Sequence, residues 1–393
     1  MMQTYFKRFL RNFDFPLFFA YLFLCLFGLV MIYSSSLIYA VGHYNWEPDH
    51  FFRKQIFNLS IAFPAFFLAA FFPYKNYKRK KIMIFSVIGM LGLLLLVHFI
   101  GYGDDVGARS WIKVGFKQFT LGSIQPSEVA KLIIIIYFSS FFAKKYESGT
   151  LDSLNKSIGP PILILVLVVG SVMTETDIGT SLIIVLVAFS VMAASGIGMK
   201  TFLKLSGLIS LVMLCVAPIL YFNWDTIMTP SRQGRFLAYL NPFDYLSGSG
   251  YQIANGYIAI GSGGVKGHGL GNSIQKMGYL PEPHTDVIMA VISEELGILG
   301  AFIVIGGLGF IVLRALSIAL KAKDPHARML AAGIGSMIAI QTFVNIGGLT
   351  GLIPLTGVPL PLISYGGTSV ILMSIAIGIL MNVSMFVKLE NNK

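Results

Sequence analysis

Long stretches with few or no charged side chains recur along the chain and constrain its fold more than any other feature. They lie at about 15–40, 55–74, 82–103, 126–143, 157–174, 178–199, 205–224, 287–313, 329–350 and 366–387. An α-helix rises about 1.5 Å per residue, so roughly 20 apolar residues cross the hydrocarbon core of a bilayer, which is about 30 Å thick. The pattern predicts an all-α, polytopic membrane protein with about ten transmembrane helices.

The composition excludes the common soluble classes. Of the 393 residues, 55% are hydrophobic and 12% are charged, whereas about 25% are charged in an average soluble domain. Cys25 and Cys215 both lie inside apolar stretches, so they offer neither a disulfide framework nor metal-ligand spacing. The first apolar stretch, 15–40, is longer than the roughly 7–15 residues of a signal-peptide core, so we expect it to remain as the first helix.

Lysine and arginine residues gather in every second connection between the expected helices. The formal net charge of +11 would fit a nucleic-acid-binding protein, but membrane proteins also concentrate Lys and Arg in their cytoplasmic loops. The residues concerned are Lys7, Arg8, Arg11, Lys75, Lys78, Arg79, Lys80, Lys81, Lys144, Lys145, Lys200, Lys204, Lys321, Lys323, Arg328 and Lys388. Their distribution predicts that both termini are cytoplasmic, and it explains the charge without a nucleic-acid partner.

Three connections on the opposite side are too long to be simple turns. They are 104–125, the large loop 225–286 between the seventh and eighth helices, and the Pro/Gly-rich 351–367. Loops longer than about 12–15 residues usually carry a function. The stretch 245–260 is apolar enough to form short helices at the membrane surface. No segment is large enough to fold alone, so residues 1–393 are expected to form a single integral membrane domain.

One apolar span opens with a charged pair. Pro126 suits the first turn of a helix, so the helix is expected to begin there. Glu128 and Lys131 are three residues apart and face the same side of that helix. The pair either links helices or lines a polar cavity. Ionisable groups at membrane depth are costly and usually line a cavity or path, so we favour the second interpretation.

A second carboxylate stands where the large loop meets the eighth span. Asp286 is expected at the boundary between water and lipid, where a carboxylate keeps its charge while apolar neighbours raise its basicity, as a general base requires. An Asp ahead of an apolar helix is also a good N-cap, and the sequence leaves both interpretations open. His284 is either a partner of this aspartate or an interfacial polar residue, and we favour the latter.

Several cations lie on the side that the positive-inside rule disfavours. They are Arg53, Arg109, Arg232, Arg235, Lys266 and Lys276. Arginine binds a diphosphate through forked hydrogen bonds and lysine binds it as a point charge, so the set suggests a basic funnel for an anionic head group. Each residue taken alone is equally well explained by pairing with a loop carboxylate. We favour the funnel for the set.

The glycine-rich stretch 261–271 is not a nucleotide-binding loop. It lacks the Walker spacing and has no strand before it or helix after it in the required order. Flexible backbone that approaches a ligand, or that lets an outer loop move, explains these glycines better. Two other outer turns are more rigid: Asp177 is expected to cap the helix that follows it, and prolines fix 357–369 ahead of the last helix.

Taken together and in this order, these motifs resemble those of the SEDS family of bacterial cell-wall proteins, the RodA/FtsW/SpoVE group. The resemblance rests on Gly107 to Ile112, Gln125 to Lys131, Asp177 to Thr180, Leu280 to Asp286 with Glu294 to Gly297, and Pro354 to Ser369. It departs from the family at Thr176, where members usually have proline, and in a longer segment between Trp111 and Gln125.

The resemblance implies ten helices in the bacterial cytoplasmic membrane and a peptidoglycan glycosyltransferase that polymerises lipid II outside it. It also implies a class B penicillin-binding protein as the transpeptidase partner. The essential aspartate of the family corresponds to Asp286, its functional Glu/Lys pair to Glu128 and Lys131, and important arginines to Arg53 and Arg109. The sequence motif from Val358 to Pro361 favours a RodA-like role in elongation over a role in division or sporulation.

With this resemblance, the residues lead us to expect an inverting glycosyl transfer. Asp286 would remove the proton from the C4 hydroxyl of an acceptor lipid II, and undecaprenyl diphosphate would leave from the donor glycan. The developing charge would be stabilised by Arg109, Lys131, Arg232, Arg235 and Lys276, and Arg53, Glu128, His284 and Ser364 complete the expected substrate-binding set. A divalent cation is a further candidate for this task, although no ligand cluster fixes one. The competing predictions are a lipid II flippase and a non-catalytic scaffold.

Overall fold

The structure, a computed structural model, describes residues 11–103, 109–116, 119–151, 159–175, 177–204, 207, 234, 237–245 and 249–391. In these parts of the chain, seven helices are long and apolar enough to cross a membrane. They are α2 (Phe15–Tyr44), α3 (His50–Phe71), α4 (Lys80–Ile100), α5 (Pro126–Glu147), α12 (Ile288–Lys321), α13 (Pro325–Leu349) and α14 (Gly367–Asn391). The all-α membrane fold is confirmed.

Two shorter apolar helices complete the bundle as far as it is described. They are α6 (Gly159–Thr174) and α7 (Ile178–Ala194), and they match the spans expected at 157–174 and 178–199. Asp177 caps α7 as expected, because its Oδ1 accepts a hydrogen bond of 2.9 Å from the backbone N–H of Thr180. The seventh expected span, 205–224, lies almost entirely outside the described residues, and Thr176 also lies outside them.

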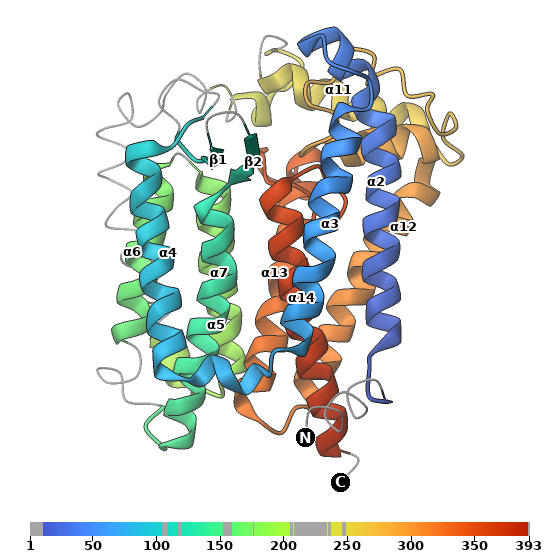
Figure 1. Cartoon of the computed structure of the whole chain (residues 1–393). Helices are drawn as coiled ribbons and strands as arrows, with labels where there is room; N and C mark the ends of the chain where they lie inside the picture. Colours follow the sequence, from blue (N-terminus) through green and yellow to red (C-terminus); the bar gives the residue numbers. More distant parts are fainter. Residues whose placement is uncertain are drawn as a thin grey trace.

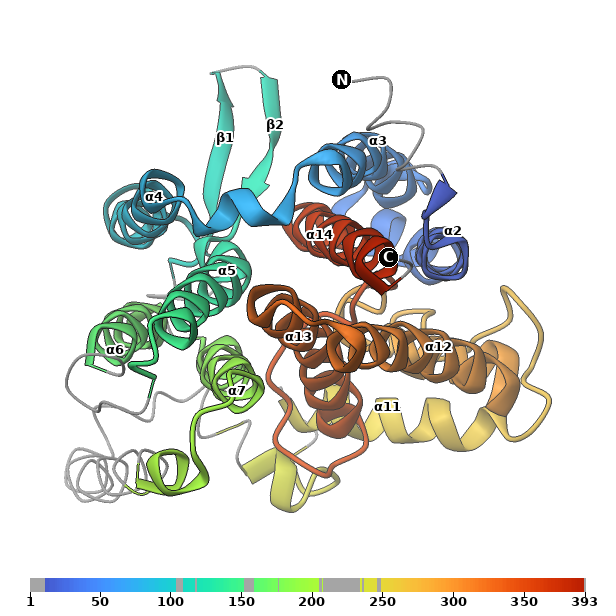
Figure 2. The same cartoon turned by 90° about the horizontal axis from the view of Figure 1, so that it is seen from below.

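The helices run side by side, with α13 and α14 in the interior (Figures 1 and 2). Helix α13 contacts α5, α7, α12 and α14, and α14 packs along α3. Helix α4 lies at the periphery, where Phe85 and Phe99 are 80% and 81% exposed. Such side chains are suited to lipid, since in a bilayer the backbone is satisfied within each helix and apolar side chains can face outward.

The two ends of the bundle differ. Helix α2 begins and α14 ends at the lower end in Figure 1, which we call the terminal end. A buried ion pair holds this end together: Asp14 is fully buried and accepts two hydrogen bonds of 3.0 Å from Arg314 of α12. Ser384 of α14 donates a third to the same carboxylate, at 2.6 Å. One carboxylate therefore joins the start of α2 to α12 and α14.

The opposite end, which we call the hairpin end, carries a two-stranded antiparallel sheet that the sequence analysis did not predict. Strands β1 (Ile112–Phe116) and β2 (Phe119–Ile124) form it within the long segment 104–125. Thr368, at the start of α14, donates a hydrogen bond of 2.5 Å to the carbonyl of Ser123. The hairpin is thereby tied to the interior of the bundle. Helix α11 (Ser249–Gly263) crosses this end (Figure 1), which confirms a helix within the stretch 245–260.

The glycine-rich stretch 261–271 packs backbone to backbone against α12. The N–H groups of His268 and Gly269 donate to the carbonyls of Glu294 and Glu295, at 3.0 and 2.9 Å. Helix α12 breaks at Gly297, which has φ 61° and ψ −152°. A Cβ atom at Gly297 would collide with the carbonyl of Val265. The glycines therefore allow two backbone segments to approach closely, which differs from the approach to a ligand or the loop movement expected from the sequence.

Gly297→Ala is expected to lower stability, because the new side chain meets Val265 and the backbone conformation is essentially restricted to glycine. The cost should be about 1–3 kcal/mol or more, measured as a fall in the melting temperature of the purified protein. Gly309→Ala is the matched control on the same helix, since nothing lies within 4 Å of its Cβ position. Equal melting temperatures for the two variants would contradict this account of the break.

Candidate active site

The charged pair at the start of α5 is buried and closely paired. Lys131 Nζ lies 2.8 Å from Glu128 Oε1, and the two side chains are 1% and 4% exposed. Pro126 is the first residue of the helix, as expected. Lys131 also donates a hydrogen bond of 2.7 Å to Oε1 of Gln341, on α13. The pair shares one face of α5, as the spacing predicted, and it is connected to the central helix.

Asp286 lies at the hairpin end, just before α12, and is 8% exposed. Its Oδ1 accepts hydrogen bonds from Thr285 Oγ1 at 3.1 Å and from Gln252 Nε2, on α11, at 3.4 Å. Its backbone carbonyl accepts from Asn345 Nδ2, on α13, at 2.6 Å. The residue at the N-cap of α12 is Val287, and its side chain makes no capping hydrogen bond.

His284 is enclosed by aromatic rings. Its ring centroid lies 4.0 Å from that of Phe51 and 5.4 Å from those of Tyr39 and Tyr365. Tyr365 N–H also donates to the His284 carbonyl, at 2.9 Å. Burial lowers the pKa of His284 to about 3, so the ring is neutral at pH 7. This environment gives His284 a packing role that holds the segment leading to Asp286.

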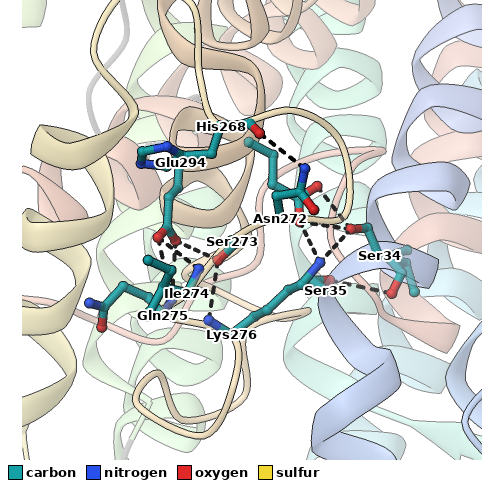
Figure 3. Close-up of polar contacts among 11 residues, drawn as sticks. Ser34, Ser35, His268, Asn272, Ser273, Ile274, Gln275, Lys276 and Glu294 are labelled. Carbon is teal, nitrogen blue, oxygen red and sulfur yellow. Dashed lines mark hydrogen bonds and ion pairs between the residues drawn. The ribbon is translucent and has the colours of Figure 1, made fainter.

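Two consecutive glutamates of α12 hold the loop that precedes Asp286, and Figure 3 shows the contacts of the first, Glu294. Glu294 is 1% exposed and accepts hydrogen bonds from the backbone N–H of Ile274, at 2.9 Å, and from that of Gln275. Ser273 donates to the same carboxylate through its hydroxyl. A buried carboxylate must be hydrogen-bonded to be tolerated, and here the donors come from the loop itself.

Glu295 forms a second buried ion pair. Its Oε1 lies 2.5 Å from Lys276 Nζ, and the side chains are 0% and 3% exposed. Ser34 of α2 donates to Glu295 at 2.8 Å and accepts from Lys276 at 2.9 Å. The loop is thus tied both to α12 and to α2. We call this set, Ser34, Ser273, Lys276, Glu294 and Glu295, the loop clamp.

The cations expected to form a funnel have separate surroundings. Arg53 is 65% exposed and lies 2.7 Å from Glu47 and 2.6 Å from Asp49. Arg109 donates to the carbonyl of His98 at 3.0 Å. Lys276 belongs to the loop clamp. These three side chains therefore have three different sets of partners.

The remaining residues of the expected set lie in three different settings. Arg232 and Arg235 lie outside the described residues. Lys266 is exposed on the glycine-rich stretch. Ser364 caps a turn of the Pro-rich loop, because its Oγ accepts a hydrogen bond of 2.9 Å from the N–H of Leu360.

The described part of the chain has no cluster of metal ligands and has an apolar groove at its periphery. Within it, no three His, Cys, Asp or Glu side chains converge so as to hold a metal ion. An apolar groove of about 660 Å³ lies along α4. It is lined by Phe85, Ser86, Gly89, Met90, Gly92, Leu93, Leu96 and Ile133.

Comparison with known proteins decides the family. The family model for FtsW, RodA and SpoVE, described as cell cycle protein, matches residues 15–389. The chain belongs to this family. The resemblance drawn from its motifs is confirmed.

Two curated members of the FtsW/RodA/SpoVE family illustrate the similarity. A probable peptidoglycan glycosyltransferase FtsW of Bacillus subtilis (strain 168) is 46% identical over 391 residues, which cover 98% of this chain and 94% of that protein. Stage V sporulation protein E of the same organism is 37% identical and covers 91% of this chain and 93% of its own. The similarity extends over nearly the whole length of each protein.

Solved structures share the fold. One, described under "Structural coordination of polymerization and crosslinking by a peptidoglycan synthase complex", has a TM-score of 0.72 at 24% identity and covers 95% of this chain and 98% of that one. The crystal structure of the Thermus thermophilus rod shape determining protein RodA has a TM-score of 0.65 at 23% identity, with 95% and 96% covered. The bundle described above is therefore the fold of the FtsW/RodA/SpoVE family.

The structure adds residues that sequence reasoning did not assign to the site. Gln341 and Asn345 of α13 contact Lys131 and Asp286, and Gln252 of α11 contacts the Asp286 carboxylate. None is charged, and each is far from its partner in sequence. Ser34 and Glu295 were likewise not recognised as partners of Lys276. No local pattern signals such contacts.

Lys276→Met is expected to destabilise the protein by about 3–5 kcal/mol, because it leaves the Glu295 carboxylate buried without its counter-charge. The double variant Lys276→Met/Glu295→Gln should recover much of that loss, since no uncompensated charge remains. Thermal unfolding of the purified protein measures both. Lys266→Met, a change of the same kind at an exposed position, should lie within about 0.5 kcal/mol of the parent. If Lys276→Met were equally harmless, the clamp would not contribute to stability.

Proposed function

We propose that this protein polymerises lipid II into glycan strands by inverting transfer, with Asp286 as the general base. The protein is a peptidoglycan glycosyltransferase. The observation that carries the proposal is the position of Asp286: a nearly buried carboxylate at the hairpin end, connected through α13 to the buried Glu128–Lys131 pair.

The reaction follows from one carboxylate and one hydroxyl. The C4 hydroxyl of the acceptor sugar gives its proton to Asp286 as its oxygen attacks the anomeric carbon of the donor. The bond from that carbon to the diphosphate breaks, and undecaprenyl diphosphate leaves with the electron pair. A single displacement inverts the anomeric configuration. Thr285 and Gln252, which donate to Asp286 Oδ1, orient the carboxylate for proton transfer.

The leaving diphosphate requires positive charge. Lys131 is linked to Asp286 through Gln341 and Asn345 of α13, and its ammonium group is paired with Glu128. We propose that Lys131 stabilises the developing charge together with Arg109, Arg232 and Arg235. Lys276 is assigned instead to the loop clamp, because its ammonium group joins the loop to Ser34 of α2 and Glu295 of α12. Arg53, exposed beside two carboxylates, is a weaker candidate for head-group contact.

The groove along α4 suits a lipid-linked substrate. Its walls are almost entirely apolar, and nothing lies within 4 Å of a Cβ position at Gly89 or Gly92. An isoprenoid tail has no hydrogen-bonding groups, so it can occupy such a groove at no cost in unsatisfied polar atoms. The groove faces the periphery of the bundle, where a tail would enter from the bilayer.

The proposed orientation has the hairpin end outside the cytoplasmic membrane and both termini in the cytoplasm. It is supported by the basic residues at the terminal end, such as Lys78, Lys144 and Lys321, where the positive-inside rule expects them. A class B penicillin-binding protein is the proposed partner. The likeness to a chain from a peptidoglycan synthase complex supports this assignment.

The cellular role is proposed to be wall synthesis in division. The two curated relatives described above carry FtsW and stage V sporulation names. These names outweigh the sequence from Val358 to Pro361, which favoured elongation. Depletion of the protein should therefore produce filamentous cells with normal width, seen by phase-contrast microscopy. Rounded or widened cells would indicate the elongation role instead.

Asp286→Asn is expected to lower the rate of lipid II polymerisation by about 10²–10⁴-fold, because the amide cannot accept the proton. Purified protein with its transpeptidase partner, incubated with lipid II, measures the glycan product. Asp244→Asn, at an exposed position in the same large loop, is the matched control and should retain full activity. A normal rate for the Asp286 variant would remove the general base from the proposal.

The same preparation separates the alternatives. Glycan product from the parent protein supports the transferase. Translocation of lipid II across vesicles without any product would support a flippase. A preparation that does neither, while still binding the penicillin-binding protein, would support a scaffold.

A further inference from the structure

Two uncharged side chains on α13 connect the groups to which the proposed reaction assigns the proton and the leaving-group charge. Gln341 is fully buried: its Oε1 accepts from Lys131 at 2.7 Å and its Nε2 donates to the carbonyl of Pro359 at 2.9 Å. Asn345 is 2% exposed, and its Nδ2 donates to the carbonyls of Asp286 at 2.6 Å and Val358 at 2.8 Å. Each amide thus joins two segments that are remote in sequence.

The spacing of the two amides gives the arrangement its geometry. Residues four apart lie on one face of a helix, about 6 Å apart along its axis. The two carbonyls that receive their second bonds belong to consecutive residues, Val358 and Pro359. Helix α13 therefore holds α5, the segment before α12 and the Pro-rich loop at fixed distances from one another.

We propose that Gln341 and Asn345 are positioning residues of the transferase site, which set the distance between Lys131 and Asp286. The inference rests on the proposed function, because it deepens the same site. Neither amide is assigned to the reacting atoms; each acts through the residue it holds. A displacement of about 1 Å at a reacting group can cost about 100-fold in rate, so loss of either link is expected to reduce turnover.

The competing explanation is that these amides only stabilise the bundle. A buried amide whose bonds are removed leaves carbonyl groups unsatisfied wherever it lies. The chain offers a matched control in Asn382 of α14. Asn382 is also fully buried and also links two backbone groups: its Nδ2 donates to Ala70 at 2.7 Å, and its Oδ1 accepts from Tyr74 N–H at 2.8 Å. It lies near the terminal end, away from Asp286.

The first measurement is steady-state polymerisation of lipid II by the full chain with its partner, with rates expressed per folded molecule. Asn345→Leu is expected to lower kcat by about 10–100-fold while KM changes by less than about twofold, because it acts on the alignment of Asp286. Gln341→Met is expected to lower kcat/KM by about 10-fold or more. Asn382→Leu should lower the melting temperature and leave kcat and KM per folded molecule unchanged.

The second measurement is hydrogen exchange followed by mass spectrometry, which requires no turnover. Asn345→Leu should accelerate exchange by about 10-fold or more in peptides covering 284–290 and 355–362, and leave 68–76 unchanged. Asn382→Leu should do the reverse. If Asn345→Leu does not fold, Asn345→Asp serves in its place, since a carboxylate of the same size cannot donate to the two carbonyls.

Three results would overturn the inference. One is a kcat per folded molecule in both α13 variants equal to that of the parent. Another is an equal fall in kcat for Asn382→Leu. The third is unchanged exchange in 284–290 and 355–362. If instead the parent protein makes no glycan while exchange responds as expected, the link across α13 stands and the proposed transferase function fails.

Discussion

The arrangement depends on pairing or hydrogen-bonding the charged side chains that are taken out of water. Three ion pairs lie inside the bundle: Glu128 with Lys131, Glu295 with Lys276, and Asp14 with Arg314. A charge alone in such an interior would be prohibitively costly, and a pair is tolerated only if further hydrogen bonds satisfy it. In each case a neutral side chain supplies one: Gln341, Ser34 and Ser384. These third partners come from other helices, so satisfying the charges also fixes how the helices are placed.

The need to bond buried charges also explains how the segment around Asp286 is held. In the loop before Asp286, backbone N–H groups bind Glu294 and Lys276 binds Glu295. The loop then leads through Asp286 into α12, about two helical turns before the same two glutamates. The break at Gly297 separates this first part of α12 from the rest. The loop, α11 and the start of α12 are hydrogen-bonded to one another. The position of Asp286 is therefore held by contacts on several sides.

The sequence specifies the parts of this structure that depend on local pattern. Apolar length predicts the helices, and the spacing of Glu128 and Lys131 predicts their pairing, because both depend on residues within a few positions of each other. The hairpin 112–124 was missed because its strands are only five and six residues long. The basic funnel was expected because these cations share one side of the membrane. The side of the membrane does not specify which group a cation binds, however. Lys276 lies nineteen residues from Glu295 in sequence and binds it in the interior.

The distribution of polar bonds also bears on how a substrate would enter. Asp286 accepts hydrogen bonds from α11 and α13, the Pro-rich loop is bonded to α13 and to His284, and the loop clamp adds α2. Helix α4, by contrast, presents mainly apolar side chains at the periphery, with a groove widened by two glycines. A lipid tail that enters along α4 breaks none of the bonds that position the carboxylate, whereas entry between α12 and α2 would have to break the Lys276–Glu295–Ser34 contacts. The bonding pattern therefore favours substrate entry from the α4 side, with the opposite side serving as the fixed support for the aspartate.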